Sequence, residues 1–584
     1  MPSLNWIGKK AVEKHHKMVP FHLLDPVPDL SFRDTESGNL IVQGDNLLAL
    51  KALLPRYARQ VKCIYIDPPY NTGNEGWIYN DNVNSPEIRK WLGEVVGKEG
   101  ETLDRHDRWL CMMYPRLLLL KQFLREDGVI FVSIDDNEIG NLQALMREIF
   151  GPSNEVATII WEKGKKGDSK LVSVTHEYVV VFVRNKALLK KLNVKWRKKK
   201  KGVDEVLDYY SSLRKKFGGD HAQIRKEMMK WYRGLPKDDP RKAHKHYNWS
   251  DERGLYFAAD FAGPDDGRKS RPRYNILHPL TKLPCAIPST GWRWEEPTTI
   301  KALAEDPPRI HFGKDHTTIP NRKSYLFEIN EEPTMSVFYK DGRSATLEVE
   351  SMLGAGSFPF PKDSEIISDL IGMVMEPGDI VLDSFAGSGT TAHAVLRLNQ
   401  HMKEPLKFLL VELDTNVALN KTRERVRKVV QGYTPLTGKK QIPVKGLGGG
   451  FQYCRLSDEP LFKADGSIRE DITFNQLAEF VWFMETGMGL AHSSIQKKQC
   501  SPFIGKFRDR AVFLLYNGIL KDKSDVGGNV LNNRTLEIID AVLVKFDGFR
   551  IVYGARNRFD KTKLERLQIV FHQLPYDLAV KTWF

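Results

Sequence analysis

Residues 379–412 hold the pattern that most restricts how this chain can fold. A short apolar run, Ile380–Asp383, is followed by a glycine-rich turn, a helical segment through residue 398 and a second apolar run, Phe408–Glu412. Two buried strands joined by a helix form a β-α-β unit, which makes the strands parallel and puts the helix on one face of a sheet. We therefore expect an α/β protein, with a Rossmann-like sheet and helices on both faces.

The turn of this unit predicts a ligand that contains adenosine. Gly387 and Gly389 allow a tight turn and a close approach of the backbone to a ligand, and Thr390 is expected to cap the following helix. Glu412 ends the second strand 29 residues after Asp383, where an acid usually binds the ribose hydroxyls of such a cofactor. A third glycine three residues after Gly389 is missing from the sequence, which disfavours NAD.

Another predicted strand, Val61–Ile66, ends in the sequence Asp67-Pro68-Pro69-Tyr70. Because the two prolines lack an N–H group, the chain must leave the sheet at Asp67, and ligands of open α/β sheets bind at such carboxyl ends of strands. A carboxylate beside a flat aromatic ring suits a planar base that carries an amino group. An ordinary turn after a strand is the alternative, although chance alone produces this tetrapeptide in a chain of this length only about a few times in a thousand.

The two stretches together resemble the DNA amino-methyltransferases that use S-adenosylmethionine. Phe385–Thr390 matches the cofactor motif of that family and Asp67–Tyr70 matches its catalytic motif, in the permuted order of the β class. Further segments also match the family: Gln43–Asn46, Arg108–Leu117, Ser133–Glu138 and His176–Tyr178. The resemblance covers residues 38–190 and 355–432, and the chain looks like the modification subunits of type III restriction systems and their solitary relatives.

The resemblance implies S-adenosylmethionine as the cofactor and assigns roles to individual residues. The catalytic set would be Asp67, Pro68, Pro69 and Tyr70. The cofactor-binding set would be Asp45, Asn46, Asp67, Lys362, Asp383, Phe385, Ala386, Gly387, Ser388, Gly389, Thr390 and Glu412. In the family, the position of Asp45 faces the adenine of the cofactor and residues 358–364 touch its methionine end, with helix capping as the alternative in both cases. No metal is expected, because direct methyl transfer needs none.

The resemblance also implies the reaction, which is methylation of the N6 amine of an adenine flipped out of duplex DNA at a specific site. The enzyme would be part of a restriction-modification system or derived from one. Adenine is favoured because the catalytic motif begins with Asp, whereas cytosine-N4 relatives more often begin with Ser. The alternatives are a cytosine-N4 or RNA methyltransferase and a catalytically silent, cofactor-binding DNA-recognition module. A damaged motif would mark the silent module, and both motifs are intact.

Positive charge is concentrated in one part of the chain. Residues 186–246 contain 20 Lys and Arg against 7 Asp and Glu, while the whole chain has a net charge of +14. The densest run supplies the predicted DNA-binding residues: Lys195, Arg197, Lys198, Lys199, Lys200 and Lys201. A solvated face is the ordinary explanation of such a run. Its position between the two catalytic halves favours contact with double-stranded DNA.

Changes in composition divide the chain into five predicted parts. These are an N-terminal lead-in (1–37), a catalytic half (38–189), a target recognition domain (190–350), a cofactor-binding half (351–435) and a C-terminal domain (450–584). Strand-like runs at 511–515, 538–544 and 567–571 make the last part an α/β appendage. It carries no chemical motif, and it is a candidate for dimerisation, for docking a nuclease-helicase restriction subunit or for widening the contact with DNA.

Length and composition exclude several classes of protein. The chain has 584 residues, of which 41% are apolar, as in a globular protein of several domains. No window holds eighteen uncharged apolar residues, so no membrane span is expected. The five cysteines are scattered, which argues against a disulfide framework or a structural zinc site. We expect a cytoplasmic homodimer, with residues 71–106 as a long loop beside the catalytic motif.

Overall fold

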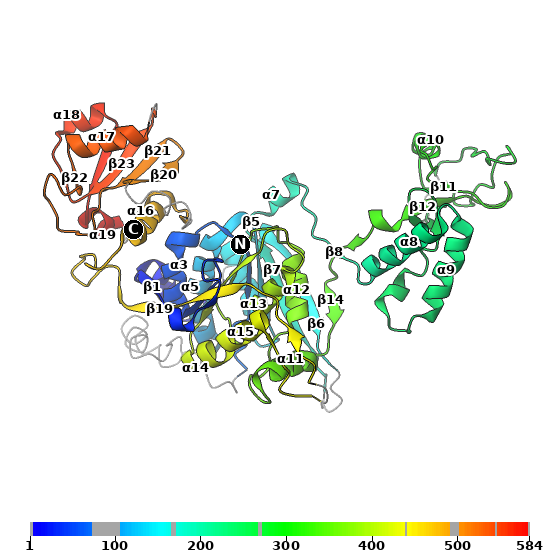
Figure 1. The fold of residues 1–584 in the computed structure, drawn as a ribbon, viewed down its shortest axis with the longest axis horizontal. Coiled ribbons are helices and arrows are strands. Elements are labelled where there is room, and N and C mark those ends of the chain that lie inside the picture. Colours follow the sequence, from blue (N-terminus) through cyan, green and yellow to red (C-terminus); the bar gives the residue numbers. More distant parts are fainter. Residues whose placement is uncertain are drawn as a thin grey trace. The chain divides into compact units, whose positions relative to one another are not determined.

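The computed structural model describes residues 4–72, 105–164, 171–266, 271–438, 441–490, 501–543 and 546–581. The chain divides into two compact units, Met1–Lys195 with Met335–Phe584 and, separately, Trp196–Thr334. Figure 1 shows both units and labels many of their helices and strands. Most of the loop expected at 71–106 lies outside the described residues.

The first unit contains one large sheet, whose strands follow the order β1-β19-β3-β16-β15-β4-β5-β7-β6-β14. Its parallel centre consists of β3 (Leu40–Gln43), β16 (Lys407–Glu412), β15 (Ile380–Asp383), β4 (Val61–Ile66) and β5 (Leu124–Ile134). The flanking strands are β1 (His22–Pro26), β19 (Gly450–Pro460), β7 (His176–Val183), β6 (Glu155–Glu162) and β14 (Val337–Tyr339). The predicted Rossmann-like α/β sheet is confirmed.

Every residue of β4 is buried, as expected of a strand covered on both faces. Ile64 and Ile66 share one core with α3 (Asn46–Tyr57), α5 (Arg105–Phe123) and α6 (Ile139–Phe150). Cys63 and Tyr65 alternate with them and are equally buried, so they point to the other face. Outside that core, a second group of helices packs together: α11 (Arg343–Leu353), α12 (Ser364–Gly372), α13 (Thr390–Leu398) and α15 (Glu424–Gln431).

The order of the central strands brings the two sequence motifs together. β15 pairs with β4 on one side and with β16 on the other, although more than 300 residues separate β4 from β15. Parallel strands end at the same edge of a sheet, so the acids at the ends of β4, β15 and β16 are neighbours. These acids are Asp67, Asp383 and Glu412.

The second unit is built around a small antiparallel sheet in the order β11-β12-β10-β9. Its strands and helices are β9 (Trp249–Ser250), β10 (Leu255–Ala259), β11 (Ile310–His311), β12 (Asn321–Tyr325), α8 (Val203–Phe217), α9 (His221–Gly234) and α10 (Glu296–Ala304). Near its two ends, β8 (Lys198–Lys199) pairs with β13 (Glu331–Glu332). The unit is shorter than the expected 190–350, because β14 pairs with β6 and residues 335–350 join the first unit.

The C-terminal part of the first unit has its own parallel-rich sheet in the order β20-β21-β23-β25. Its elements are α16 (Phe474–Thr486), β20 (Phe503–Phe507), β21 (Arg510–Leu514), α17 (Asn533–Val542), β23 (Phe549–Gly554), α18 (Lys561–Arg566) and β25 (Ile569–Gln573). The expected boundary at 450 is not a structural break, since β19 belongs to the main sheet. The strand predicted at 538–544 is wrong. A capping box at Asn532 and Thr535 starts a helix there instead.

Candidate active site

The catalytic motif leaves the sheet where the sequence predicted, directly after the buried strand β4. One oxygen of Asp67, Oδ2, lies 2.8 Å from Nζ of Lys362. The other oxygen, Oδ1, is buried and has no hydrogen-bond partner among the residues that the structure describes. Buried polar atoms are rarely left unpaired, so this oxygen is a candidate acceptor for a bound ligand.

Lys362 is the cation at the centre of this site. Its side chain is buried, and Nζ lies 3.5 Å from Glu177 Oε2 and 4.8 Å from the ring centroid of Tyr70. Burial lowers the pKa of Lys362. The carboxylates of Asp67 and Glu177 raise it by more than burial lowers it, so the net pKa lies above its ordinary value. Lys362 therefore remains charged and holds the Asp67 carboxylate in position.

Glu177 and Lys163 complete the cluster, and sequence reasoning gave neither of them a role. Glu177 accepts a hydrogen bond from the Tyr70 hydroxyl at 3.0 Å and forms an ion pair with Lys163. Burial raises the pKa of Glu177, and the two lysines lower it to a net value below its usual range. Glu177 did appear in a matched segment, whereas nothing in the sequence separates Lys163 from other lysines. The site thus contains two carboxylates balanced by two ammonium groups.

The loop after β4 is fixed by hydrogen bonds to α5 and α6. The indole N–H of Trp109 donates to the carbonyl of Pro69 at 2.8 Å. Asn71, whose φ is 59°, donates to the carbonyl of Arg105 at 3.2 Å and to the buried carboxylate of Glu138. These bonds order the two prolines and Tyr70 before any ligand arrives.

The cofactor motif forms a turn whose own polar groups shape it. Asp383 accepts hydrogen bonds from the Phe385 N–H at 2.9 Å and from the Thr391 hydroxyl at 2.5 Å. Glu412 accepts from the Gly387 N–H at 2.8 Å. Burial raises the pKa of Asp383 to about 7, so this acid is easily protonated. Gly387 and Ala386 are therefore held against the ends of β15 and β16.

A buried arginine supports the far side of the same turn. Arg425 donates to the hydroxyls of Ser388 and Thr390, both at 2.8 Å, and to Glu348 at 3.0 Å. The expectation that Thr390 caps α13 is wrong, because Gly389 occupies the cap position at φ 79° and Thr390 is the first helical residue. The Thr390 hydroxyl accepts a hydrogen bond from Arg425 instead of capping the helix.

Asp45 and Asn46 lie at the start of α3, where they have clear structural roles. Asp45 caps the helix by accepting from the N–H groups of Leu47 and Leu48 at 2.9 Å. Asn46 donates to the carbonyl of Ser384 at 3.3 Å and accepts from the buried Arg116 at 2.5 Å. The two residues join α3 to the cofactor turn, and their predicted contact with the cofactor stays a prediction.

The cofactor turn has features that fit S-adenosylmethionine. The hydroxyl of Ser384 is buried without a hydrogen-bond partner among the described residues, so it can serve a bound ligand. Gly387 has a φ of 50°, and a Cβ added there would lie 3.3 Å from Phe358 Cζ. The residues available to hold the cofactor are thus Ser384, Gly387 and the acid Glu412.

The predicted DNA-binding run lies at the beginning of the second unit and is partly neutralised. Lys199 forms an ion pair with Asp204 at 2.7 Å, and Lys200 donates to the carbonyl of Ile329 at 2.6 Å. Lys198 and Lys199 also face two acids across the β8–β13 pair. Lys195, Arg197 and Lys201 are exposed. DNA contact by this run remains a prediction.

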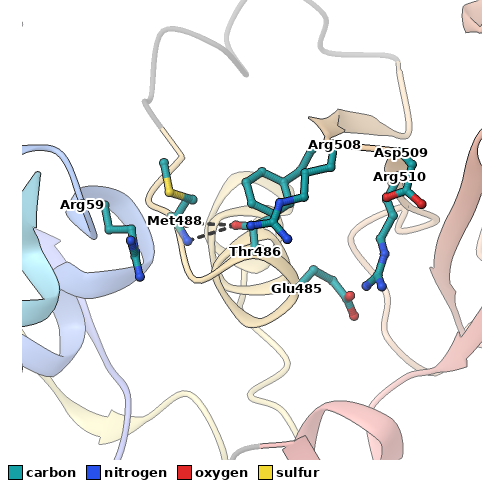
Figure 2. A pocket seen from close by; sticks show the side chains of 8 residues that line it. Arg59, Glu485, Thr486, Met488, Arg508, Asp509 and Arg510 are labelled. Atoms are coloured by element: carbon teal, nitrogen blue, oxygen red, sulfur yellow. Dashed lines mark hydrogen bonds between the residues drawn. The ribbon is translucent and has the colours of Figure 1, made fainter. Parts of the chain in front are cut away.

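A separate pocket lies in the C-terminal part of the first unit. Figure 2 shows Arg59 on one side of it and Arg508 and Arg510 on the other, with Glu485 and Asp509 nearby. No residue of either methyltransferase motif lines this pocket. Within the described residues, no group of three or more His, Cys, Asp or Glu side chains could hold a metal ion, and no helix has both the length and the apolar character to cross a membrane.

Comparison with known proteins identifies the family. The family described as DNA methylase matches residues 61–418. The chain belongs to the DNA methylase family. It is 33% identical to the EcoP15I Mod subunit, of a type III restriction-modification enzyme from Escherichia coli, over 79% of this chain and 72% of that one. The family predicted from the two motifs is confirmed, and with it an S-adenosylmethionine-dependent DNA methyltransferase of the restriction-modification type.

Other relatives cover the chain to different extents. The EcoPI Mod subunit of Escherichia phage P1 is 32% identical over 72% of this chain and 64% of its own length. The type II methyltransferase M.KpnI of Klebsiella pneumoniae is 28% identical over 74% of this chain and 94% of its own length. This chain therefore spans less than two thirds of the EcoPI subunit. The solved PvuII cytosine-N4-specific DNA methyltransferase is a distant likeness, with 11% identity over 67% of this chain and 86% of its own and a TM-score of 0.31.

Proposed function

We propose that this methylase transfers a methyl group to the N6 amine of an adenine flipped out of duplex DNA, at a specific site. The observation that carries the proposal is the buried Oδ1 of Asp67, which has no hydrogen-bond partner among the described residues, while Lys362 binds Oδ2. An acceptor so arranged suits an amine donor. Asp at the first position of the motif supports adenine over cytosine as the target.

The mechanism follows from the chain's own groups. The exocyclic amine of adenine is a poor nucleophile, because its lone pair is delocalised into the ring. Hydrogen bonds from the amine to Asp67 Oδ1 and to the Pro68 carbonyl would favour a pyramidal nitrogen with an available lone pair. When bound, S-adenosylmethionine supplies an electrophilic methyl group on sulfur. Lys362 orients the Asp67 carboxylate through their 2.8 Å ion pair, so positioning is the main contribution of the protein.

The target base must leave the DNA stack, which costs a few kcal/mol. Tyr70 would offset part of this by stacking on the base, a contact worth roughly 1–3 kcal/mol. Its hydroxyl is fixed by Glu177, so the ring is already oriented. Burial raises the pKa of Tyr70 well above its ordinary value, which keeps the hydroxyl protonated as the donor in that bond.

The partners follow from the similarity to Mod subunits. We propose that residues 196–334 recognise the DNA sequence, that the enzyme acts in the cytoplasm as a homodimer, and that a restriction subunit can associate with it. The basic excess of this unit supports the DNA contact.

The decisive experiment identifies the modified nucleoside and its sequence. Expression of the chain in a host without methylation should yield N6-methyladenine in the genomic DNA, at one sequence found by modification-sensitive sequencing. The Asp67→Ala chain, expressed in parallel to the same level, should yield far less of this product. Detection of N4-methylcytosine would show that cytosine, and not adenine, is the target base. Absence of both products would contradict the proposed activity.

A further inference from the structure

A cavity of about 510 Å³ lies where the C-terminal part of the first unit packs against the end of α3 (Figure 2). Arg59, which follows that helix, lines it together with Arg508 and Arg510 of the β20–β21 hairpin. Arg59 precedes β4, whereas Asp67 follows that strand. The cavity therefore lies toward the opposite end of β4 from the catalytic motif, and no residue of that motif lines it.

Two of the three arginines have a backbone conformation that is unfavourable for a residue with a Cβ. The φ angles are 58° at Arg59 and 56° at Arg508. Arg508 is the first residue of a two-residue turn between the paired residues Phe507 and Arg510, where Gly or Asn is normally favoured. Backbone strain of this kind is found where a side chain has a use. The use common to both residues is a cation at the same cavity.

The charges of these arginines are available to a ligand. Arg508 and Arg510 are exposed, and among the residues that the structure describes neither forms an ion pair with an acid. Arg508 lies instead over the ring of Phe507, 5.2 Å from its centroid. Arg59 pairs with Glu126 at 3.0 Å, and both side chains are about half exposed. Such an exposed pair contributes little to stability, so it leaves Arg59 free to bind another anion.

Two acids in the lining do not cancel this charge. The side chain of Glu485 is 8% exposed, accepts a hydrogen bond from the hydroxyl of Tyr553 and lies 3.8 Å from Nε2 of His572. Its carboxylate is thus already bound on the side of the C-terminal sheet. Asp509 is exposed and pairs with neither neighbouring arginine in the described part of the chain. Three guanidinium groups therefore outweigh one exposed acid, which favours an anionic ligand.

Close backbone contacts join the walls of the cavity. The N–H of Gly489 donates to the carbonyl of Ala58 at 2.8 Å, and a Cβ added at Gly489 would clash with the carbonyl oxygen of Arg56. Gly505 of β20 packs directly against α16, since an added Cβ would lie 2.7 Å from the ring of Trp482. The arginines of α3 and of the hairpin are therefore held around the cavity before a ligand binds.

We propose that this cavity binds a small phosphate-bearing molecule with at least two negative charges, held by Arg59, Arg508 and Arg510. Guanidinium groups match the geometry of phosphate oxygens and bind them bidentately. The volume falls within the range of about 300–1,000 Å³ that is usual for small-molecule sites. A nucleic-acid backbone is instead bound along an extended basic groove. The site is separate from methyl transfer and does not rest on the proposed function.

The test removes charge while keeping the backbone. Arg508→Asn and Arg59→Asn each delete a guanidinium group, and Asn tolerates a positive φ better than most residues. Both variants should therefore keep the thermal unfolding midpoint of the unmodified chain. The probe is inorganic pyrophosphate, titrated calorimetrically into the full chain. We expect one pyrophosphate per chain, and an affinity about tenfold or more lower in each variant, as for one lost charge-assisted hydrogen bond.

A matched control and a competitor complete the experiment. Arg566→Gln removes one exposed positive charge from α18, outside the cavity, and should leave the pyrophosphate affinity unchanged. The inference would be overturned by an equal loss in this control, by unchanged affinity in both Asn variants, or by absence of binding to the unmodified chain. A random-sequence DNA duplex, added at the same ionic strength, should not displace the pyrophosphate. Displacement would mean that the cavity holds backbone phosphates of DNA and not a small molecule.

Discussion

Asp67 and Asp383 end neighbouring parallel strands, and the protein uses them differently. Asp67 has one oxygen bound to Lys362 and one without a partner among the described residues. Both oxygens of Asp383 accept hydrogen bonds from the turn that follows it. Under the proposed function, Asp67 keeps an acceptor oxygen for the substrate, while Asp383 shapes the cofactor turn. Changes at the first should lower turnover, and changes at the second should weaken cofactor binding.

The largest expected effect is on turnover at the catalytic end. Asp67→Ala should reduce kcat about a hundredfold to a thousandfold, since it removes a positioned electrostatic contact that matters mainly in the transition state. Calorimetric titration should show an almost unchanged affinity for S-adenosylmethionine. Asp67→Asn keeps the shape and removes the charge, so it tests whether charge is the essential property. A near-normal kcat for the Ala variant would show that Asp67 is not needed for turnover and would contradict the proposed difference between Asp67 and Asp383.

The opposite failure is expected at the cofactor turn. Gly387→Asp places a side chain on a residue with a φ of 50°, within 3.3 Å of Phe358 and beside the carboxylate of Glu412. The left-handed conformation alone costs about 1–2 kcal/mol, and the new charge adds repulsion. Cofactor binding should weaken more than tenfold, as measured by calorimetry. Gly466→Asp is the matched control, because Gly466 has a φ of 77° with no atom within 4 Å of an added Cβ.

A smaller loss is expected when the cluster around Asp67 loses one charge. Glu177→Gln should lower kcat about tenfold, because Lys362 and Lys163 then share a single carboxylate and Asp67 is no longer held in one position. KM for the cofactor should stay the same. The control is Glu155→Gln, which breaks a surface ion pair with Arg147 at the start of β6. Equal effects of the two variants would show that Glu177 is only structural.

The pH dependence of turnover should report the same cluster. Burial and the nearby Lys362 lower the pKa of Lys163 to about 8, so its ammonium is present below pH 8 and is lost above it. Glu177 then loses one of its two cations, and kcat should fall as the pH rises through 8. Lys163→Arg should move this fall to higher pH, since a guanidinium keeps its charge. An identical pH profile for both enzymes would exclude Lys163 from the cluster's function.

The smallest effects should be found in the second unit, where charges act one at a time. Arg197 is exposed, so Arg197→Ala should reduce the slope of log K against log salt for DNA binding by about 0.9. Lys199 is already paired with Asp204, so Lys199→Ala should change the slope less. Binding measured across a salt series distinguishes them. Equal slopes for both variants and the unmodified chain would mean that this run is solvated surface.

The strands and the acids at their ends could be predicted from the sequence. Which side chains, distant in the sequence, contact those acids could not. Val61–Ile66 and Ile380–Asp383 could be recognised because local composition decides whether a segment is a buried strand. The ion pair of Lys163 with Glu177 forms because β6 pairs with β7 and because both side chains are largely buried. Such a contact has no local signal.

Two features of the structure have no signal in local composition. The basic run at 195–201 looks like free charge in the sequence, but β13 brings Glu331 and Glu332 opposite Lys199 and Lys198 from more than 130 residues away, and DNA contact by this run stays a prediction. The apolar residues after 537 suggest a strand, whereas the cap at Asn532 decides for a helix. Local composition predicted the buried strands correctly. It was not sufficient where a helix cap or a distant strand determines the structure.

The place of β15 in the middle of the sheet has a consequence for biosynthesis. When the ribosome has made β4 and β5, the inner edge of β4 still lacks the strand that will pair with it, because β15 follows more than 300 residues later. At about 5–20 residues per second, this interval lasts on the order of tens of seconds. During that time an apolar strand with an open edge is exposed to other chains. The second unit, made within this interval, can fold early as a compact body while the catalytic half waits for its central strand.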